Sequence, residues 1–310
     1  MAKGPIHKRY AIIEAPSILG LRPTGVERLA STLLEHGLAA RLQARHHGRV
    51  ETLPYTSHRD PATLTLNAHS IAAWSPRLAD VVEQVLDRGE FPVILGGDCS
   101  ILLGSTLALR RRGRFGLLFV DGHADFYQPD AEPTGEAASM DLAFVTGYGP
   151  PLLTDIEQRR PLVRAEDAVA FGFRDTEEQI RHGSQPLPPD LLGLDLATVR
   201  RMGVVNAATA AVERVTRPGL EGFFLHLDAD SLDDAIMPAV EYRLGDGFGW
   251  DELRSVLTTA LASGRVVGLE VTVYNPALDE GGRAGRGLAE MLAAALGTGV
   301  SSPIIAPGSS

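Results

Sequence analysis

Acidic side chains recur directly after apolar segments of the chain, in short groups that suit metal binding. In chain order the groups are Gly96-Gly97-Asp98-Cys99, Asp121-Gly122-His123-Ala124-Asp125 and Asp228-Ala229-Asp230. In an extended segment, the alternate positions of these polar residues would place their side chains on one side. Several carboxylates on one site cannot all ionise without a compensating cation. This many oxygen donors with one imidazole therefore predicts a site for two divalent metal ions rather than one.

Helix capping is the alternative interpretation of these acids. An aspartate that follows a strand often caps the helix that begins there, by accepting hydrogen bonds from the first backbone N–H groups. Capping needs one acid per turn, however, whereas these acids fall in register on separate segments. We therefore favour metal binding.

The apolar segments that carry these groups are typical of buried strands in one sheet. Strands are predicted over residues 10–15, 91–95, 116–120, 168–173, 222–227 and 266–273. Apolar residues at helical spacing lie between these strands, over 26–33, 78–85, 102–112 and 253–257, and after the last of them, over 288–295. This alternation predicts the α/β class, a three-layer α/β/α fold with a central, mostly parallel sheet. The polar groups then sit at the carboxyl ends of the strands, where open α/β sheets place their sites.

The rest of the chain shows no internal repeat or low-complexity linker. Residues 1–310 are therefore predicted to form a single domain, with long loops over 44–66 and 128–138 and a flexible tail over 301–310.

Composition narrows the class of protein further. A net charge of −10 and a pI of about 5.4 argue against nucleic acid as a partner. No apolar stretch approaches the roughly 20 residues that a membrane span needs, so no membrane partner is expected. The N-terminus lacks the apolar core of a signal peptide, which predicts a cytoplasmic protein. The single cysteine, Cys99, excludes an internal disulfide.

The same motifs give the chain a family resemblance. It resembles the arginase/agmatinase (ureohydrolase) superfamily of binuclear manganese hydrolases, from the first predicted strand to Tyr274-Asn275-Pro276. That family carries Asp-Ala-His-x-Asp, matched by the group that begins at Asp121, and Asp-x-Asp after an apolar strand, matched by the group at Asp228. Its Gly-Gly-Asp-His-Ser motif appears here with Cys99 in place of the histidine.

The resemblance implies an arginase-like fold and a set of metal ligands. Asp121 and Asp228 would bridge two divalent ions, most readily Mn²⁺, while Asp125 and position 99 complete the first ion and His123 and Asp230 the second. The implied chemistry is attack on a small molecule by metal-bound hydroxide. Family members are usually homo-oligomers, so the same is expected here. The candidate metal ligands are thus Cys99, Asp121, His123, Asp125, Asp228 and Asp230.

Cys99 is the first departure from the family pattern. A thiolate is a soft ligand that suits zinc, iron or cobalt better than manganese. Three interpretations stay open. The thiolate binds the ion and changes the metal preference; or it lies close but unbound, which leaves one ion weakly held; or it is an inert, small buried residue.

Two further departures concern residues that act on the substrate in the family. Ala138 stands at the position of the histidine that shuttles protons, so Glu136 or Asp141 would have to substitute, unless both are ordinary loop acids. Val273 stands at the position of the glutamate that pairs with the guanidinium. Glu270 has the opposite pleat parity and is predicted to be structural. The candidate catalytic residues are Asp125, Asp228 and Glu136.

Five residues are candidates for holding the substrate. After the third motif the chain has Glu241-Tyr242-Arg243. Glu241 would supply a carboxylate to a cationic substrate, Tyr242 would contact a planar group, and Arg243 would hold a substrate carboxylate. A salt bridge on the rim of the site is the alternative interpretation. Asp175 and Glu177 match a family loop that holds an α-amino group, although an Arg174–Asp175 ion pair is an alternative. His226 shares pleat parity with Asp228 and would lie behind the metal ligands or simply in the core.

These observations predict an amidinohydrolase that cleaves a C–N bond of a guanidino-type small molecule. Without the shuttle histidine and the guanidinium glutamate, ordinary arginase activity is not expected, and an N-hydroxyguanidino compound is a better candidate. Hydrolysis of a non-guanidino amide or amidine, or a non-catalytic relative with a weakened metal site, are the alternatives.

Overall fold

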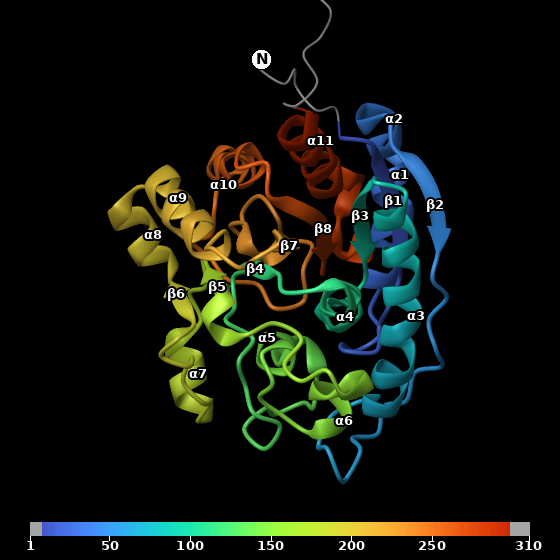
Figure 1. The fold of residues 1–310 in the computed structure, drawn as a ribbon, viewed down its shortest axis with the longest axis vertical. Helices are drawn as coiled ribbons and strands as arrows, with labels where there is room; N and C mark the ends of the chain where they lie inside the picture. The colour runs from blue at the N-terminus through green and yellow to red at the C-terminus, as the bar shows by residue number, and fades with distance from the viewer. Residues whose placement is uncertain (1–7, 298–310) are drawn as a thin grey trace, which may run out of the picture.

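Eight parallel strands form one sheet within residues 8–297, the part of the chain that this computed structural model describes (Figure 1). The strand order is β2-β1-β3-β8-β7-β4-β5-β6. The strands are β1 (Tyr10–Ala15), β2 (Arg45–Arg49), β3 (Phe91–Gly96), β4 (Gly116–Val120), β5 (Ala168–Phe171), β6 (Leu192–Leu194), β7 (Phe223–Asp228) and β8 (Val266–Thr272). The tail predicted over 301–310 lies outside the described residues.

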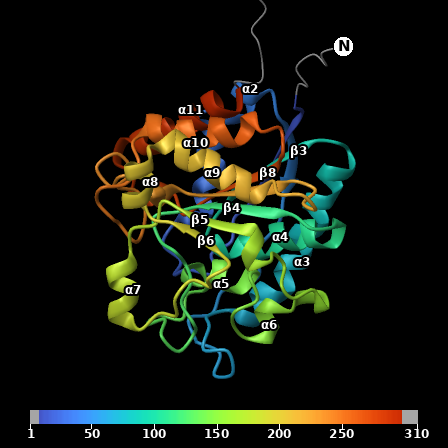
Figure 2. The same ribbon diagram turned by 60° about the vertical axis from the view of Figure 1, so that its left-hand side comes forward.

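Helices cover both faces of the sheet because its central strands are apolar on both sides. Alternate residues of one strand enter different cores: Leu118 packs on one face with Ile12, whereas Leu117 packs on the other with Ile13. Figure 2 shows the two helical layers with the sheet between them. The predicted three-layer α/β/α fold with a parallel sheet is confirmed.

The two layers contain different segments of the chain. The first layer holds α1 (Leu29–Glu35), α2 (Leu38–Leu42), α8 (Leu196–Met202), α9 (Val204–Val215), α10 (Trp250–Ala262) and α11 (Arg283–Gly297). The second holds α3 (Ala68–Asp87), α4 (Leu102–Arg112), α5 (Asp141–Val145) and α6 (Pro151–Thr154). A further helix, α7 (Thr176–His182), has no buried residue.

Short 3-10 helices join these elements. They are η1 (Val26–Arg28), η2 (Cys99–Ile101), η3 (Ala137–Ser139), η4 (Ile156–Gln158), η5 (Ala165–Asp167), η6 (Ala229–Ser231), η7 (Pro276–Leu278) and η8 (Glu280–Gly282). Among the described residues, no helix combines the length and apolar character that a bilayer crossing requires.

The central strands lie where the sequence predicts them, but both edge strands were not predicted. The loop predicted over 44–66 is wrong in part, because β2 lies within it and pairs with β1. β2 is polar, Arg-His-His-Gly-Arg, and an edge strand held by backbone hydrogen bonds needs no apolar pattern. β6 at the opposite edge has only three residues. The strand predicted to 173 stops at Phe171, because Gly172 takes a positive φ of 94° and turns the chain.

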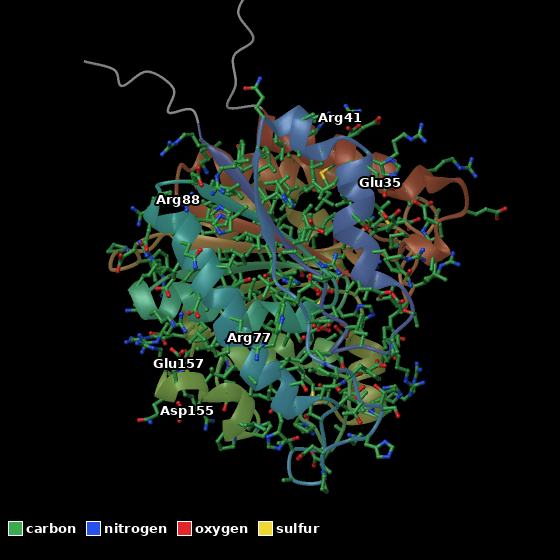
Figure 3. All side chains as sticks on the ribbon, turned by 90° about the vertical axis from the view of Figure 1, so that its right-hand side faces the viewer. Glu35, Arg41, Arg77, Arg88, Asp155 and Glu157 are labelled. Atoms are coloured by element: carbon green, nitrogen blue, oxygen red, sulfur yellow. The ribbon has the colours of Figure 1, made fainter. Side chains whose placement is uncertain are left out.

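Charged side chains tie the second layer together on its outer side. Arg111, at the end of α4, donates to Asp80 and Glu83 of α3 and to Glu157 of η4. Figure 3 faces this side of the molecule and labels Glu157. These acids lie near the surface beside an arginine, unlike the acids at the carboxyl ends of the strands.

Candidate metal centre

The three predicted acidic groups meet at the carboxyl ends of β3, β7 and β4, of which only β7 and β4 are direct neighbours in the sheet. Asp98 follows β3, Asp121 follows β4, and Asp228 ends β7. Gly122 lets two of the groups approach closely: its N–H donates to Asp230 at 3.0 Å, and a Cβ at this position would lie 2.6 Å from the Asp230 carbonyl oxygen.

The groups are turns rather than extended segments, so the predicted reason for their common direction is wrong. The first aspartate of each group accepts a hydrogen bond from the backbone N–H two residues later: Asp98 from Ser100, Asp121 from His123 and Asp228 from Asp230. Asp98 and Asp228 thereby cap η2 and η6. Capping and clustering are compatible in Asp228, where Oδ1 caps while Oδ2 faces Cys99. Asp98 only caps, because its Oδ2 accepts from Ser17 Oγ at 2.9 Å.

Three sets of side chains bring donor atoms within 4.8 Å of one another in a way that would suit a metal ion. The sets are Asp121, His123 and Asp230; Cys99, Asp121, His226 and Asp228; and Cys99, Asp125 and Asp141. All of these residues are buried except His123, which is partly exposed. Two members, His226 and Asp141, were not among the ligands predicted from the sequence.

Burial and mutual repulsion disfavour the ionised form of most of these acids. Burial, and then the neighbouring carboxylates, raise the pKa of Asp125 and Asp228 well above the usual value. Burial raises the pKa of Asp141 in the same way. The pKa of Asp121 is lowered despite its burial, because His123 and His226 lie beside it. The cluster therefore holds more acid than its own side chains can neutralise.

Unpartnered atoms in the cluster fit divalent ions. Asp121 Oδ2, Asp141 Oδ2 and His226 Nε2 are all buried and lack a hydrogen-bond partner in the part of the chain that the structure describes. A buried polar atom without a partner is costly, and these three atoms belong to residues of the sets given above. Carboxylate, imidazole and thiolate groups are together a chemically suitable ligand set for first-row divalent metals.

Cys99 lies inside the cluster rather than apart from it. Its buried Sγ is 2.8 Å from Asp228 Oδ2 and 3.2 Å from Thr272 Oγ1. Burial, followed by the charge of Asp228, raises the pKa of the thiol well above its usual value. Only a bound cation would favour the thiolate here.

A pocket of about 330 Å³ opens above this cluster. Cys99, His123, Asp125, Asp228 and Asp230 contribute to its lining from the metal-binding groups. Its walls add further acids and aromatic groups, namely Tyr127, Glu132, Glu136, Asp175, Glu178 and Tyr242, with His182. The pocket lining that the structure describes contains no lysine or arginine.

The predicted substrate-binding residues divide between this pocket and other places. Asp175 and Tyr242 line the pocket, whereas Glu177, Glu241 and Arg243 are not among its lining residues. Glu241 accepts a hydrogen bond from Asn275 Nδ2 at 2.6 Å. Arg243 pairs with Asp234 at 3.1 Å on the exposed rim, as the alternative interpretation held.

Arg174 does not form the ion pair with Asp175 that the sequence allowed as an alternative. It donates instead to main-chain carbonyls, including those of Asp230 at 2.9 Å and Leu244 at 2.8 Å. Asp175 accepts from Gln179 Nε2 at 2.8 Å, and burial raises its pKa.

Sequence reasoning missed the pocket residues that come from α7. Glu178 and His182 lie one turn apart on this helix and line the pocket. The available signal was the i, i+3 spacing of Asp175 and Glu178, which places two acids on one helical face. Because no helix was predicted here, this spacing did not indicate that the two acids share a face.

Glu136 lines the pocket and connects it with the surface. Its carboxylate contacts the Tyr242 hydroxyl and lies 3.4 Å from the exposed Arg22. Burial raises the pKa of Glu136.

Ala138 and Val273 also line the pocket, and they present only apolar atoms to it. Val273 adopts a positive φ of 70°, which is strained for a β-branched residue. Glu270 is directed away from the pocket, where its carboxylate bonds to His226 and Ser105.

Comparisons with known proteins agree with this architecture. The family model described as "Arginase family" matches residues 10–297. The chain is 28% identical to an arginase of Bacillus caldovelox, over 88% of this chain and 93% of that protein. It is 28% identical to an arginase of Brevibacillus brevis over the same shares of the two chains. The solved structure of the B. caldovelox arginase superposes with a TM-score of 0.83 at 25% identity, covering 94% of this chain and 98% of that one.

Proposed function

This chain belongs to the arginase family, and we propose that it is a metal-dependent hydrolase that cleaves a C–N bond of a cationic, guanidino-type small molecule. The relatives that carry the name arginase support the reaction class. The proposal depends on one observation above all, which is the acidic pocket over a buried set of metal-binding side chains.

The charge of the pocket selects for a cation. Asp175 and Glu178 lie on its wall, and the described lining offers no arginine or lysine to neutralise them. A guanidinium or amino group placed between these acids would gain charge-assisted hydrogen bonds. An anionic substrate would instead meet like charges, which disfavours phosphate esters and dicarboxylates.

The metal-binding side chains supply the reactive centre. We assign Asp121, His123 and Asp230 to one divalent ion. We assign Cys99, Asp125 and Asp228 to the surroundings of a second, where two of the sets overlap at Cys99. Two divalent ions lower the pKa of water and so supply a nucleophile at neutral pH. Mn²⁺ is typical of the family, although the sulfur of Cys99 favours a softer metal.

Glu136 is the group that we assign to proton transfer. Ala138 cannot carry a proton, whereas Glu136 lines the same pocket and has a raised pKa because it is buried. Its contacts with Tyr242 and Arg22 connect the pocket with solvent. A Glu136→Gln variant should lose the acidic limb of the pH–rate profile while it keeps the metal content of the wild type.

The same departures from the family define the substrate. Val273 offers no carboxylate to a guanidinium, so we expect poor turnover of arginine. An N-hydroxyguanidino compound is less basic than a plain guanidine and so depends less on a carboxylate partner, which makes it our preferred substrate. We also expect a cytoplasmic homo-oligomer, which size-exclusion chromatography of the purified protein and fractionation of its host cell would test.

Metal analysis combined with a substrate panel tests this proposal. The purified protein would be loaded with Mn²⁺, Co²⁺ or Zn²⁺, its ion content measured, and urea or hydroxyurea release assayed from guanidino and N-hydroxyguanidino compounds. We expect about two ions per chain and turnover of one of these compounds. Ammonia release from an amide or amidine alone would favour the alternative hydrolase, and a chain that binds no metal would contradict the proposal.

A further inference from the structure

His226 is a buried imidazole with one nitrogen that has no partner. It lies on β7, two residues before Asp228, and is fully buried. Its Nε2 has no hydrogen-bond partner among residues 8–297. A buried histidine normally uses both ring nitrogens, so the unpaired Nε2 requires an explanation.

The other side of the ring is fixed in place. His226 Nδ1 is 2.7 Å from Glu270 Oε1, and Glu270 Oε2 accepts from Ser105 at 2.5 Å. The ring also stacks on Phe119, with centroids 4.4 Å apart and an interplanar angle of 4°. A carboxylate that accepts from one ring nitrogen leaves the lone pair of the other nitrogen available, and this is how proteins orient metal-binding histidines.

The free nitrogen is directed at the metal-binding side chains. His226 Nε2 is 3.8 Å from Asp121 Oδ2, which also has no hydrogen-bond partner. This distance is too long for a hydrogen bond. It suits two ligands of one ion, each at roughly 2.0–2.2 Å from it.

Two more donors complete the same set. Donor atoms of Cys99 and Asp228 lie within 4.8 Å of those of Asp121 and His226, and all four residues are buried. Cys99 and Asp228 are in contact with each other through Sγ and Oδ2. The set therefore contains one sulfur, one nitrogen and two oxygen donors, which is a suitable number for a tetrahedral ion.

We infer that His226 is a metal ligand and that it forms, with Cys99, Asp121 and Asp228, a buried four-donor site for a zinc- or cobalt-type ion. The imidazole that the family supplies from position 99 is thus supplied here from β7. The sulfur and nitrogen donors favour zinc, cobalt or iron over manganese. This inference rests on the proposed function only in that the chain binds divalent ions.

The other set around Cys99 is less suitable for the same ion. It consists of Cys99, Asp125 and Asp141, and it has no nitrogen donor. Asp141 also commits Oδ1 to the N–H of Leu142 at 2.8 Å. An Asp141→Asn variant is therefore expected to keep the ion that His226 holds.

Cobalt is the probe for this site, because thiolate ligation gives Co²⁺ a near-ultraviolet charge-transfer band and a tetrahedral ligand field intensifies its visible absorption. Metal-free wild type, His226→Asn and His69→Asn would be titrated with Co²⁺. Asparagine retains a donor for Glu270 but has no atom at the Nε2 position. His69 is the matched control, since it is exposed on α3 and pairs with Asp60 at 3.2 Å.

We expect the charge-transfer band in the wild type and in His69→Asn. In His226→Asn the cobalt affinity of the site that gives this band should fall at least about 10-fold, the scale of losing an interaction that supports a metal ligand. An unchanged band and affinity in His226→Asn would overturn the inference and leave the proposed function standing. A wild type that binds no ion would contradict both.

A measurement on the wild type alone covers the case in which His226→Asn does not fold. X-ray absorption spectroscopy of the zinc-loaded protein counts imidazole ligands. One imidazole per zinc in a two-zinc protein requires both His123 and His226. One imidazole for every two ions would overturn the inference.

Discussion

Both ends of the sheet bury an aspartate, but the buried carboxylate has arginine partners at one end and acidic neighbours at the other. Asp167 precedes β5 at the amino ends of the strands, and its side chain is 1% exposed. Its carboxylate accepts from Arg114 at 2.7 Å and from Arg217 at 2.9 Å. Asp228 ends β7 at the carboxyl ends and is buried as well, but its neighbours include Asp121 and other acids.

The difference lies in where the compensating cation comes from. At the amino ends the chain supplies its own guanidinium groups, so the carboxylate is neutralised as soon as the protein folds. At the carboxyl ends the cluster raises the pKa of Asp228 through burial and repulsion. A carboxylate that the fold leaves uncompensated is a site prepared for an ion from solution. Replacing the buried aspartate should therefore destabilise the protein at the amino ends and stabilise the metal-free protein at the carboxyl ends.

The largest expected effect comes from Asp228→Asn. Asparagine retains the oxygen that caps Asp230 at 2.7 Å, so the turn should persist while an anionic ligand is lost. We expect kcat/KM for the guanidino-type substrate to fall at least about 10³-fold, the scale of losing an essential electrostatic group. Steady-state kinetics checks this, and a fall of less than 10-fold would remove Asp228 from the reactive centre.

Metal removal comes second. An ion that binds only the folded protein stabilises it by about 2.7 kcal/mol when its concentration is 100 times the dissociation constant. Chelation should therefore lower the melting temperature, and added Zn²⁺ should restore it. Thermal unfolding followed by circular dichroism measures the shift. Equal melting temperatures with and without metal would show that the acidic cluster does not need a cation.

Asp167→Asn tests the opposite end of the sheet. Two arginines lose their anionic partner, and because both are about one-third exposed we expect the free energy of unfolding to fall by only about 2 kcal/mol. Urea denaturation gives this value, and metal content should stay that of the wild type. Asp228→Asn, in the metal-free protein, should instead raise the melting temperature, because it removes a buried carboxyl group whose raised pKa reflects an environment that disfavours its ionised form. If both substitutions changed the stability of the metal-free protein in the same direction, the proposed difference between the two ends of the sheet would be wrong.

Lys8 gives the smallest expected effect, at the amino ends of β1 and β8. Its Nζ donates to the Val266 carbonyl at 3.2 Å, and burial lowers its pKa from 10.5 to about 8. The unfolded chain therefore binds more protons than the folded one between those two values, so this residue makes stability rise with pH. Lys8→Met should be more stable than wild type at pH 7, and the difference should shrink towards pH 10. A difference that does not change with pH would contradict the shift.

Whether the sequence predicts a strand depends on the interaction that stabilises that strand. The central strands β1, β3, β4, β7 and β8 were predicted to within two residues, because burial on both faces requires continuous apolar runs. β2 and β6 were missed, since backbone hydrogen bonds hold an edge strand and leave no apolar pattern.

The candidate site divides in the same manner. Strand ends bring the acidic groups together, so their clustering was predictable from chain order. The pocket wall was less predictable: Glu177 and Glu178 differ by about 100° around α7, and only Glu178 lines the pocket. The direction of His226 depends on Glu270, a residue 44 positions away in the sequence.

The strained backbone of Val273 bears on how this pocket could change over generations. A φ of 70° is strained for a β-branched residue, and the strain is smaller for a residue that is unbranched at Cβ. Glutamate is unbranched at Cβ, and the genetic code separates it from valine by a single base substitution. It is also the residue that the family resemblance places at this position. A single base substitution would thus restore a carboxylate to the pocket wall and also lower the backbone strain at this position. Under the proposed function, we therefore expect Val273→Glu to be tolerated by the fold and to improve the turnover of a plain guanidine.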